Sequence, residues 1–177
     1  MRKKRSIDSR SAWWPHLIWA VACQGCGNMP WYEKTVEIKN YKWHEADTLH
    51  FRVEKPDTNL RYRICLGFRV GHTYPFSNLY VFFLTRFPDS RWSQDTLHFL
   101  LSDKRGKPTG ECAGKVCDYY FILRDQFKFP QYGDYIFSVV QAMRTPDGTL
   151  PDVRAVYLKV EHNTQPSTKE TAAVPGS

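Results

Sequence analysis

The stretch LRYRICLGFRV, residues 60–70, decides the fold class, because its apolar residues recur at every second position over its whole length. The apolar set is Leu60, Tyr62, Ile64, Leu66, Phe68 and Val70, and the residues between them are Arg61, Arg63, Cys65, Gly67 and Arg69. Successive side chains of a β-strand point to opposite faces, so a period of two places the apolar set on one face. The stretch therefore predicts a strand that buries one side.

Seven further runs of the same kind lie on either side of this stretch. They are residues 35–39, 48–54, 78–85, 96–102, 119–127, 134–143 and 153–161. Turn-forming combinations of Pro, Gly and Asp separate them, and no convincing long amphipathic helix intervenes. Short strands without crossover helices are typical of an antiparallel architecture. We therefore expect an all-β antiparallel sandwich of about eight strands, with jelly-roll or immunoglobulin-like connections.

The positive charge of the chain is concentrated at its N-terminus. The formal net charge is +7, but the first 22 residues hold five of the 25 Lys and Arg residues and one of the 18 Asp and Glu residues. The rest of the chain holds 20 basic and 17 acidic residues, a net charge of +3. This excess of positive charge is smaller than that expected of a protein that binds a nucleic-acid phosphate backbone. We expect no nucleic-acid partner.

The N-terminus itself resembles an export signal. A basic cluster, MRKKR, precedes an apolar run over residues 13–22 that is too short to span a bilayer, and Cys23 follows it. The stretch AVAC, residues 20–23, resembles a bacterial lipobox, which would make Cys23 the site of lipid attachment. An ordinary signal peptide and a hydrophobic N-terminal strand are the alternatives, and Cys26 stands in a poorer cleavage context.

These observations divide the chain into four parts. A signal peptide is expected at residues 1–22, a lipidated tether at 23–32, and a single β-sandwich domain at 33–162. The last part, residues 163–177, is rich in Ser, Thr and Pro without an apolar period, so we expect a disordered tail. Acylation would hold the domain at a membrane outside the cytoplasm.

Two cysteines in the segment ECAGKVC are candidates for a disulfide. Cys112 and Cys117 are separated by four residues that include Gly114, so a turn could bring them together. A compartment outside the cytoplasm permits disulfides. Two free thiols, or half of a zinc site, are the alternative interpretations, and a zinc site needs four ligands. We expect no metal and no cofactor.

The sequence contains no complete zinc-protease, phosphate-loop or GxSxG nucleophile-elbow motif. The stretch HEADT, residues 44–48, begins like a zinc-protease helix but has Thr48 where the second histidine is needed. A hydrolase that uses a pair of Asp carboxylates is our third and least favoured hypothesis. The candidate Asp residues all lie next to turns or strand ends, where an Asp side chain more often bonds backbone amides. The candidate carboxylates are Asp103, Asp118, Asp125, Asp134, Asp147 and Asp152.

The three arginines of the opening stretch also allow two interpretations. Arg61, Arg63 and Arg69 could meet lipid head groups or an acidic partner. Charged outward positions on an edge-like strand also prevent unwanted strand pairing.

The aromatic stretch HTYPFSNLYVFF, residues 72–83, has two interpretations as well. Both alternating sets of its strand are apolar, which predicts a strand that is covered on both faces or whose outer face meets a partner. A carbohydrate-binding module would instead expose aromatic rings as stacking platforms, for which Trp43, Tyr74 and Trp92 are candidates.

Three segments carry a resemblance to a known family. YPFSNLYVFF (residues 74–83) is followed by DTLHFLLSDKRGKPTGE (95–111) and QYGDYIFSVVQAMRTPDGTLPDVRAVYLKVE (131–161). This succession resembles the gliding-motility lipoprotein family GldH, and the similarity covers residues 36–161. The motif positions are Ser77 and Asn78 in the first segment and Gln141 and Arg144 in the third. The resemblance favours acylation of Cys23.

The resemblance implies a non-enzymatic outer-membrane lipoprotein that binds envelope proteins of the gliding or type IX secretion machinery. It carries over no catalytic residues. Ser77, Asn78, Gln141 and Arg144 are then partner-facing or structural, with Asn78 and Gln141 bonding backbone groups at strand ends in the structural case. The alternative function is a cell-surface carbohydrate-binding module with a glycan as its ligand.

Overall fold

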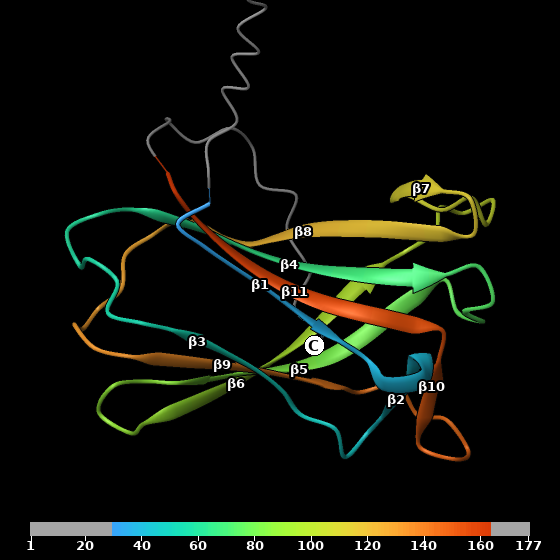
Figure 1. The fold of residues 1–177 in the computed structure, drawn as a ribbon, viewed down its shortest axis with the longest axis horizontal. Coiled ribbons are helices and arrows are strands. Elements are labelled where there is room, and N and C mark those ends of the chain that lie inside the picture. The colour runs from blue at the N-terminus through green and yellow to red at the C-terminus, as the bar shows by residue number, and fades with distance from the viewer. Residues whose placement is uncertain (1–29, 164–177) are drawn as a thin grey trace, which may run out of the picture.

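The computed structural model describes residues 30–163, which form an all-β domain (Figure 1). The predicted signal peptide, Cys23, Cys26 and the predicted tail from residue 164 onward lie outside the described residues. The strands are β1 (Tyr32–Glu37), β2 (Lys42–His44), β3 (Leu49–Val53), β4 (Tyr62–Gly71), β5 (Asn78–Arg86), β6 (Trp92–Leu100), β7 (Glu111–Ala113), β8 (Val116–Phe127), β9 (Tyr135–Gln141), β10 (Thr149–Pro151) and β11 (Val153–His162), with a single 3-10 turn at Lys39–Tyr41. Within this part of the chain, no helix has the length and apolar character needed to cross a bilayer.

The eight strands expected from the period of two are all present. They are β1, β3, β4, β5, β6, β8, β9 and β11. The short strands β2, β7 and β10 have three residues each, which is too few for an alternating pattern to stand out in the sequence.

Two antiparallel sheets form the sandwich. One has the order β1-β11-β4-β8-β7 and the other the order β3-β9-β5-β6, while β10 and β2 form a separate pair. In the view of Figure 1 the five-stranded sheet lies toward the top and the four-stranded sheet toward the bottom. The expected antiparallel β-sandwich is therefore confirmed.

The pairing of the eight long strands follows a jelly roll. Counted along the chain, the first pairs with the eighth (β1 with β11), the second with the seventh (β3 with β9), the third with the sixth (β4 with β8) and the fourth with the fifth (β5 with β6). All these pairs are antiparallel, so the chain is one long hairpin rolled into two sheets. Of the two expected connection schemes, this order is that of a jelly roll rather than that of an immunoglobulin domain.

The core fills the space between the two sheets. Alternate residues of β4, including Leu66 and Phe68, face Leu79 and Val81 of β5 and their neighbours, and all four are fully buried. Burial of a side chain of this size stabilises the fold by about 1.5–3 kcal/mol. Trp43 of β2 is also fully buried, and its Nε1 donates a hydrogen bond to the carbonyl of Asp47 at 3.0 Å.

Strand β4 is central, not edge-like as its arginines suggested. It lies between β11 and β8 in the five-stranded sheet. Arg63 forms an ion pair with Asp125, and Arg69 forms one with Asp118, both on the neighbouring strand β8. The charges therefore do not protect an edge. They are matched across a strand pair, which the sequence of one strand alone cannot show.

Candidate functional site

The two motif segments of the sequence meet at one end of the four-stranded sheet. Strand β5, which begins at Asn78, pairs with β9, which ends at Gln141. Beyond β9, the amide of Ala142 donates to the carbonyl of Tyr80 at 2.8 Å, and the amide of Tyr80 lies 3.3 Å from Sδ of Met143. We call this region the motif end, comprising residues 74–80 and 141–144.

Gln141 ties the motif end together from inside. Its side chain is only 2% exposed. Its Nε2 donates to the carbonyl of Gly148 at 3.1 Å, and its Oε1 accepts a hydrogen bond from the amide of Met143 at 2.8 Å. The side chain therefore joins the end of β9 to the turn before β10. This is a structural use of a buried polar group, with both ends of the amide bonded.

Asn78 and Ser77 occupy the start of β5. The carbonyl of Asn78 accepts the hydroxyl of Tyr74 at 2.8 Å, and its Nδ2 lies 3.2 Å from Nε2 of His98. The carbonyl of Ser77 accepts the amides of Leu101 at 2.8 Å and Ser102 at 3.1 Å, while its side chain is exposed. Burial raises the pKa of Tyr74 far above its usual range, so the phenol is a fixed hydrogen-bond donor.

The outer side of the four-stranded sheet combines apolar side chains with polar ones such as Ser138, whose hydroxyl lies 2.8 Å from Nδ1 of His50. The ring of Tyr80 stacks on that of His98 with centroids 4.2 Å apart and planes 7° apart. Phe82 is the cross-strand neighbour of Val140. We name the half-buried set that shares this side the outer apolar face: Tyr80, Phe82, Leu84, Ile136 and Val140. Apolar side chains on the outward side of a sheet are candidates for contact with another molecule.

Arg144 stands beside this face. Its side chain is exposed and lines an open hollow. The other residues that line this hollow include Glu45, Met143, and Phe82 and Val140 of the outer apolar face. Among the four motif residues, Ser77 and Arg144 therefore have exposed side chains, whereas Gln141 is internal and Asn78 is half-buried.

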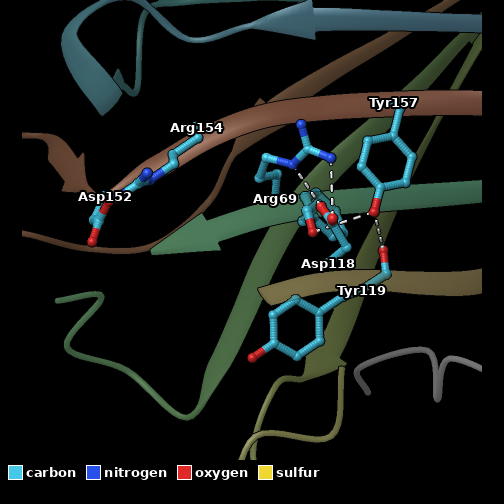
Figure 2. A network of polar contacts seen from close by, with 7 residues as sticks. Arg69, Asp118, Tyr119, Asp152, Arg154 and Tyr157 are labelled. Carbon is cyan, nitrogen blue, oxygen red and sulfur yellow. Dashed lines mark hydrogen bonds and ion pairs between the residues drawn. The ribbon is translucent and has the colours of Figure 1, made fainter. Parts of the chain in front are cut away.

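A network of polar contacts covers part of the five-stranded sheet (Figure 2). Arg69 donates two hydrogen bonds to the carboxylate of Asp118, at 2.8 and 3.0 Å. Close to this pair, the hydroxyl of Tyr157 donates to the carbonyl of Tyr119 at 2.9 Å. The ring of Tyr157 lies over Gly67, where a Cβ atom would come within 1.7 Å of Cε2. The network therefore locks β11, β4 and β8 together.

Asp152 holds the loop after β4 at the beginning of β11. Its carboxylate accepts hydrogen bonds from the amide and hydroxyl of Thr73 and from Nε of Arg154 at 3.0 Å. Burial alone would raise the pKa of Asp152, but the hydrogen bonds from Thr73 and Arg154 outweigh it and lower that pKa below its usual value.

The other candidate carboxylates also have identifiable structural contacts. Their partners are Arg69 for Asp118, Arg63 for Asp125, Arg52 for Asp134, the amides of Arg105 and Lys107 for Asp103, and the amide of Thr149 for Asp147.

The two cysteines of ECAGKVC face each other across the β7–β8 hairpin. Cys112 is the cross-strand partner of Cys117, with Cα atoms 4.0 Å apart, and the two form a disulfide. Gly114 supplies a positive φ of 60° in the connecting turn. Cys65 is buried on β4, and burial raises the pKa of its thiol to about 11.

The aromatic residues proposed as sugar platforms are not arranged as a row. Trp43 is fully buried as a member of the hydrophobic core, so its assignment as a platform was wrong. Tyr74 is half-buried, and Trp92 is 68% exposed. The alternating pattern did not single out two other exposed rings, Tyr120 and Tyr132.

The stacked pair of Tyr80 and His98 also escaped sequence reasoning. The alternation TLHF places His98 opposite Leu97, on the outer side of β6, and the sequence therefore predicts only an exposed strand position. Its stacking partner follows from the register that joins Tyr80 to His98 across β5 and β6.

Comparisons with known proteins agree on one family. The model of the family described as GldH lipoprotein matches residues 30–160. The chain is similar to a gliding motility lipoprotein GldH homolog of Christiangramia forsetii, with 27% identity over 104 residues, covering 59% of this chain and 64% of that protein. It is also similar to the gliding motility lipoprotein GldH of Flavobacterium johnsoniae, with 25% identity over 114 residues, covering 64% and 70%. The first match thus spans less than two thirds of the relative.

Proposed function

Because the chain belongs to the GldH lipoprotein family, we propose that it is a non-enzymatic accessory or scaffold protein of the envelope machinery for gliding motility and type IX secretion. In this proposal Cys23 carries the lipid anchor and the outer membrane is its location. The names of both relatives support the motility assignment, since each is described as a gliding motility lipoprotein or its homolog.

The observation that carries the proposal is the outer apolar face beside the motif end. A half-buried apolar strip on the outward side of a sheet gains stability when a partner covers it, because contact removes apolar surface from water. The exposed side chain of Arg144 at its margin adds a charged group that can select an acidic partner. This combination suits an interface with another protein.

In-cell crosslinking tests the proposal. A photoreactive amino acid is placed at position 82, on the outer apolar face, or at position 122, on the outer side of the five-stranded sheet as a matched control. Crosslinked products are isolated from the outer membrane and identified by mass spectrometry, and the Cys23→Ser variant gives the background. We expect motility or secretion proteins at position 82 and fewer at position 122.

Two results would contradict this proposal. Equal products at both positions would remove the outer apolar face as the binding surface. Recovery of polysaccharide alone would favour the carbohydrate-binding alternative and make glycan binding by the exposed rings of Trp92 and Tyr120 the next measurement.

A further inference from the structure

One end of the sandwich concentrates exposed apolar side chains. We call it the tether end, comprising residues 30–32 at the start of β1 and residues 54–61, 86–92 and 128–134. Within residues 30–163, seven large hydrophobic side chains are exposed. Four of them belong to this end: Trp31, Leu60, Trp92 and Tyr132, the last two being 68% and 69% exposed.

The strand register places these residues at the same end. In the four-stranded sheet, Trp92 is the partner of Arg86, where β5 ends, and Arg86 is the partner of Ile136 near the start of β9. In the five-stranded sheet, Tyr62 at the start of β4 is the partner of His162 at the end of β11.

A chain of ring contacts connects the two sheets and supports the exposed residues. Ring centroids of Trp31 and Tyr62 are 5.4 Å apart, those of Tyr62 and Phe129 are 5.1 Å apart, and those of Phe129 and Tyr135 are 4.8 Å apart. Phe87 continues the chain to the β5–β6 loop, with its centroid 5.9 Å from that of Tyr135. Of the four exposed side chains, Trp31 belongs to this chain of rings, and Phe87 and Phe129 tie to it the loops next to Trp92 and Tyr132.

Basic residues surround an open hollow at this end. Its lining includes Arg52, Lys55, Arg86 and Asp134. Arg52 is bound to Asp134 at 2.5 Å and lies 3.5 Å from Glu54, so these charges are largely balanced. Among the described residues, Lys55 and Arg86 have no acidic side chain within 4.0 Å. Asp134, whose pKa is lowered chiefly by its hydrogen bond from Arg52, also interacts with the charge of Lys55, so Arg86 is the less compensated of the two cations.

The lipid anchor would attach at the same end. Strand β1 begins there at Tyr32, and Cys23 lies seven residues before Pro30. An extended chain covers at most about 3.6 Å per residue, so the covalent distance from the acylated cysteine to Pro30 is at most about 25 Å. This step rests on the proposed function, which assigns the anchor to Cys23.

We propose that the tether end docks on an anionic phospholipid surface. Trp92, Tyr132 and Leu60 lie at the level of the head groups, and Lys55 and Arg86 contact lipid phosphates. Trp and Tyr concentrate at membrane interfaces because one part of the side chain is apolar and the other is wet. Basic side chains are attracted to anionic head groups, and a second attachment supplements the acyl chains.

Docking fixes the direction in which the partner surface points. Strand β5 runs from Asn78 at the motif end to Arg86 at the tether end over nine residues. At about 3.3 Å per residue, this length places the motif end roughly 30 Å from the docked end. The lipid surface therefore does not compete with a partner bound at Tyr80, Phe82 and Val140, whereas Ile136, at the other end of the outer apolar face, lines the tether-end hollow.

The test measures how deeply each end lies in the lipid. Two variants of the lipidated protein are made in a Cys26→Ser background: Tyr132→Cys at the tether end and Tyr41→Cys at the opposite end. In each variant the new cysteine is labelled with a polarity-sensitive fluorophore. Both are reconstituted in vesicles of phosphatidylethanolamine and phosphatidylglycerol with brominated lipid as quencher. We expect a blue shift and quenching for the label at position 132 and neither for the label at position 41.

The outcomes separate docking from anchoring. Protein that floats with the vesicles but shows equal emission and quenching at both positions retains its anchor and overturns docking. Protein that does not float contradicts the anchor at Cys23, and the charge variants of the unacylated protein then decide whether the tether end docks by itself.

Charge variants give a second measurement. Unacylated Cys23→Ser protein is tested for binding to the same vesicles with Lys55→Glu and Arg86→Glu, or with Lys104→Glu and Arg105→Glu as the control at the opposite end. The first pair should weaken binding by about fivefold or more for each charge, and the control pair should have less effect. Equal losses for the two pairs would contradict docking through the tether end.

Discussion

The residues of the two sequence motifs divide into those that hold the fold and those that a partner can reach. Gln141 belongs to the first group, because both ends of its amide bond backbone groups in the interior. Arg144, three residues later, belongs to the second, because its side chain is exposed beside the outer apolar face.

Substitution of each residue should therefore have a different effect. Gln141→Leu leaves the carbonyl of Gly148 and the amide of Met143 without their partner, and we expect it to lower the free energy of unfolding by about 1–3 kcal/mol. Arg144→Ala should change it by no more than about 0.5 kcal/mol and should reduce crosslinking at position 82. Urea unfolding measures the first effect, and a similar loss of stability in both variants would argue against this division.

Gly67 is a second residue whose identity the structure explains. An added Cβ would overlap the ring of Tyr157. We expect Gly67→Ala to destabilise the domain by about 1–3 kcal/mol, because the ring must move from its packed position. The matched measurement introduces the same substitution in a Tyr157→Ala background, where the cost should be much smaller. An unchanged cost would show that the ring is not its cause.

At the scale of single elements, Asp152 connects the loop after β4 to β11. Its pKa is lowered in the folded state, so its contribution to stability is present above the unfolded pKa near 3.8 and is lost as the pH falls through the folded pKa. We expect the stability of the parent protein to fall more steeply below about pH 4 than that of Asp152→Asn. Urea unfolding over a series of pH values makes the comparison, and parallel curves would remove Asp152 as a source of acid sensitivity.

The hairpin of β7 and β8 makes a separate prediction about thiols. Alkylation of the folded protein without reduction should leave Cys112 and Cys117 linked in a non-reducing mass spectrum, and Cys65 should react slowly because burial raises the pKa of its thiol to about 11. Cys112→Ser with Cys117→Ser should cost at most about 2 kcal/mol, since the closed loop is short. Rapid modification of Cys112 and Cys117 would show that the bond is absent.

Elements of sufficient length could be predicted from the sequence, and pairings between them could not. A strand such as β4 shows ten residues of alternation, whereas β7 and β10 show three. Arg63 and Arg69 looked like residues of an edge because their partners, Asp125 and Asp118, lie on β8. Likewise Ser77, Asn78, Gln141 and Arg144 could be selected as motif positions, but their meeting at one end depends on the pairing of β5 with β9.

At the scale of the whole molecule, the domain has two ends with different chemistry. The tether end exposes Trp92 and Tyr132, and the motif end presents Arg144 beside the outer apolar face. A lipid anchor at Cys23 would hold the first toward the bilayer and leave the second to other envelope proteins.

Removal of the anchor should change the location of the whole protein. We expect Cys23→Ser to move most of the chain out of the membrane fraction, because docking by the domain alone lacks the acyl chains that make attachment durable. The remainder should be released by salt, since charges at Lys55 and Arg86 would hold it. Fractionation with and without salt measures both amounts, and complete retention at high salt would count against a lipid anchor at this cysteine.

The position of β11 has a consequence for export. Within residues 30–163 this strand is the last, and it lies between β1 and β4, so the five-stranded sheet stays divided until residues 153–162 are available. The contacts of β1 with β11 join residues more than a hundred positions apart, and such contacts form late. In a chain that crosses a membrane from its N-terminus onward, β1 and β4 would therefore stay without their shared neighbour β11 until residues 153–162 have emerged.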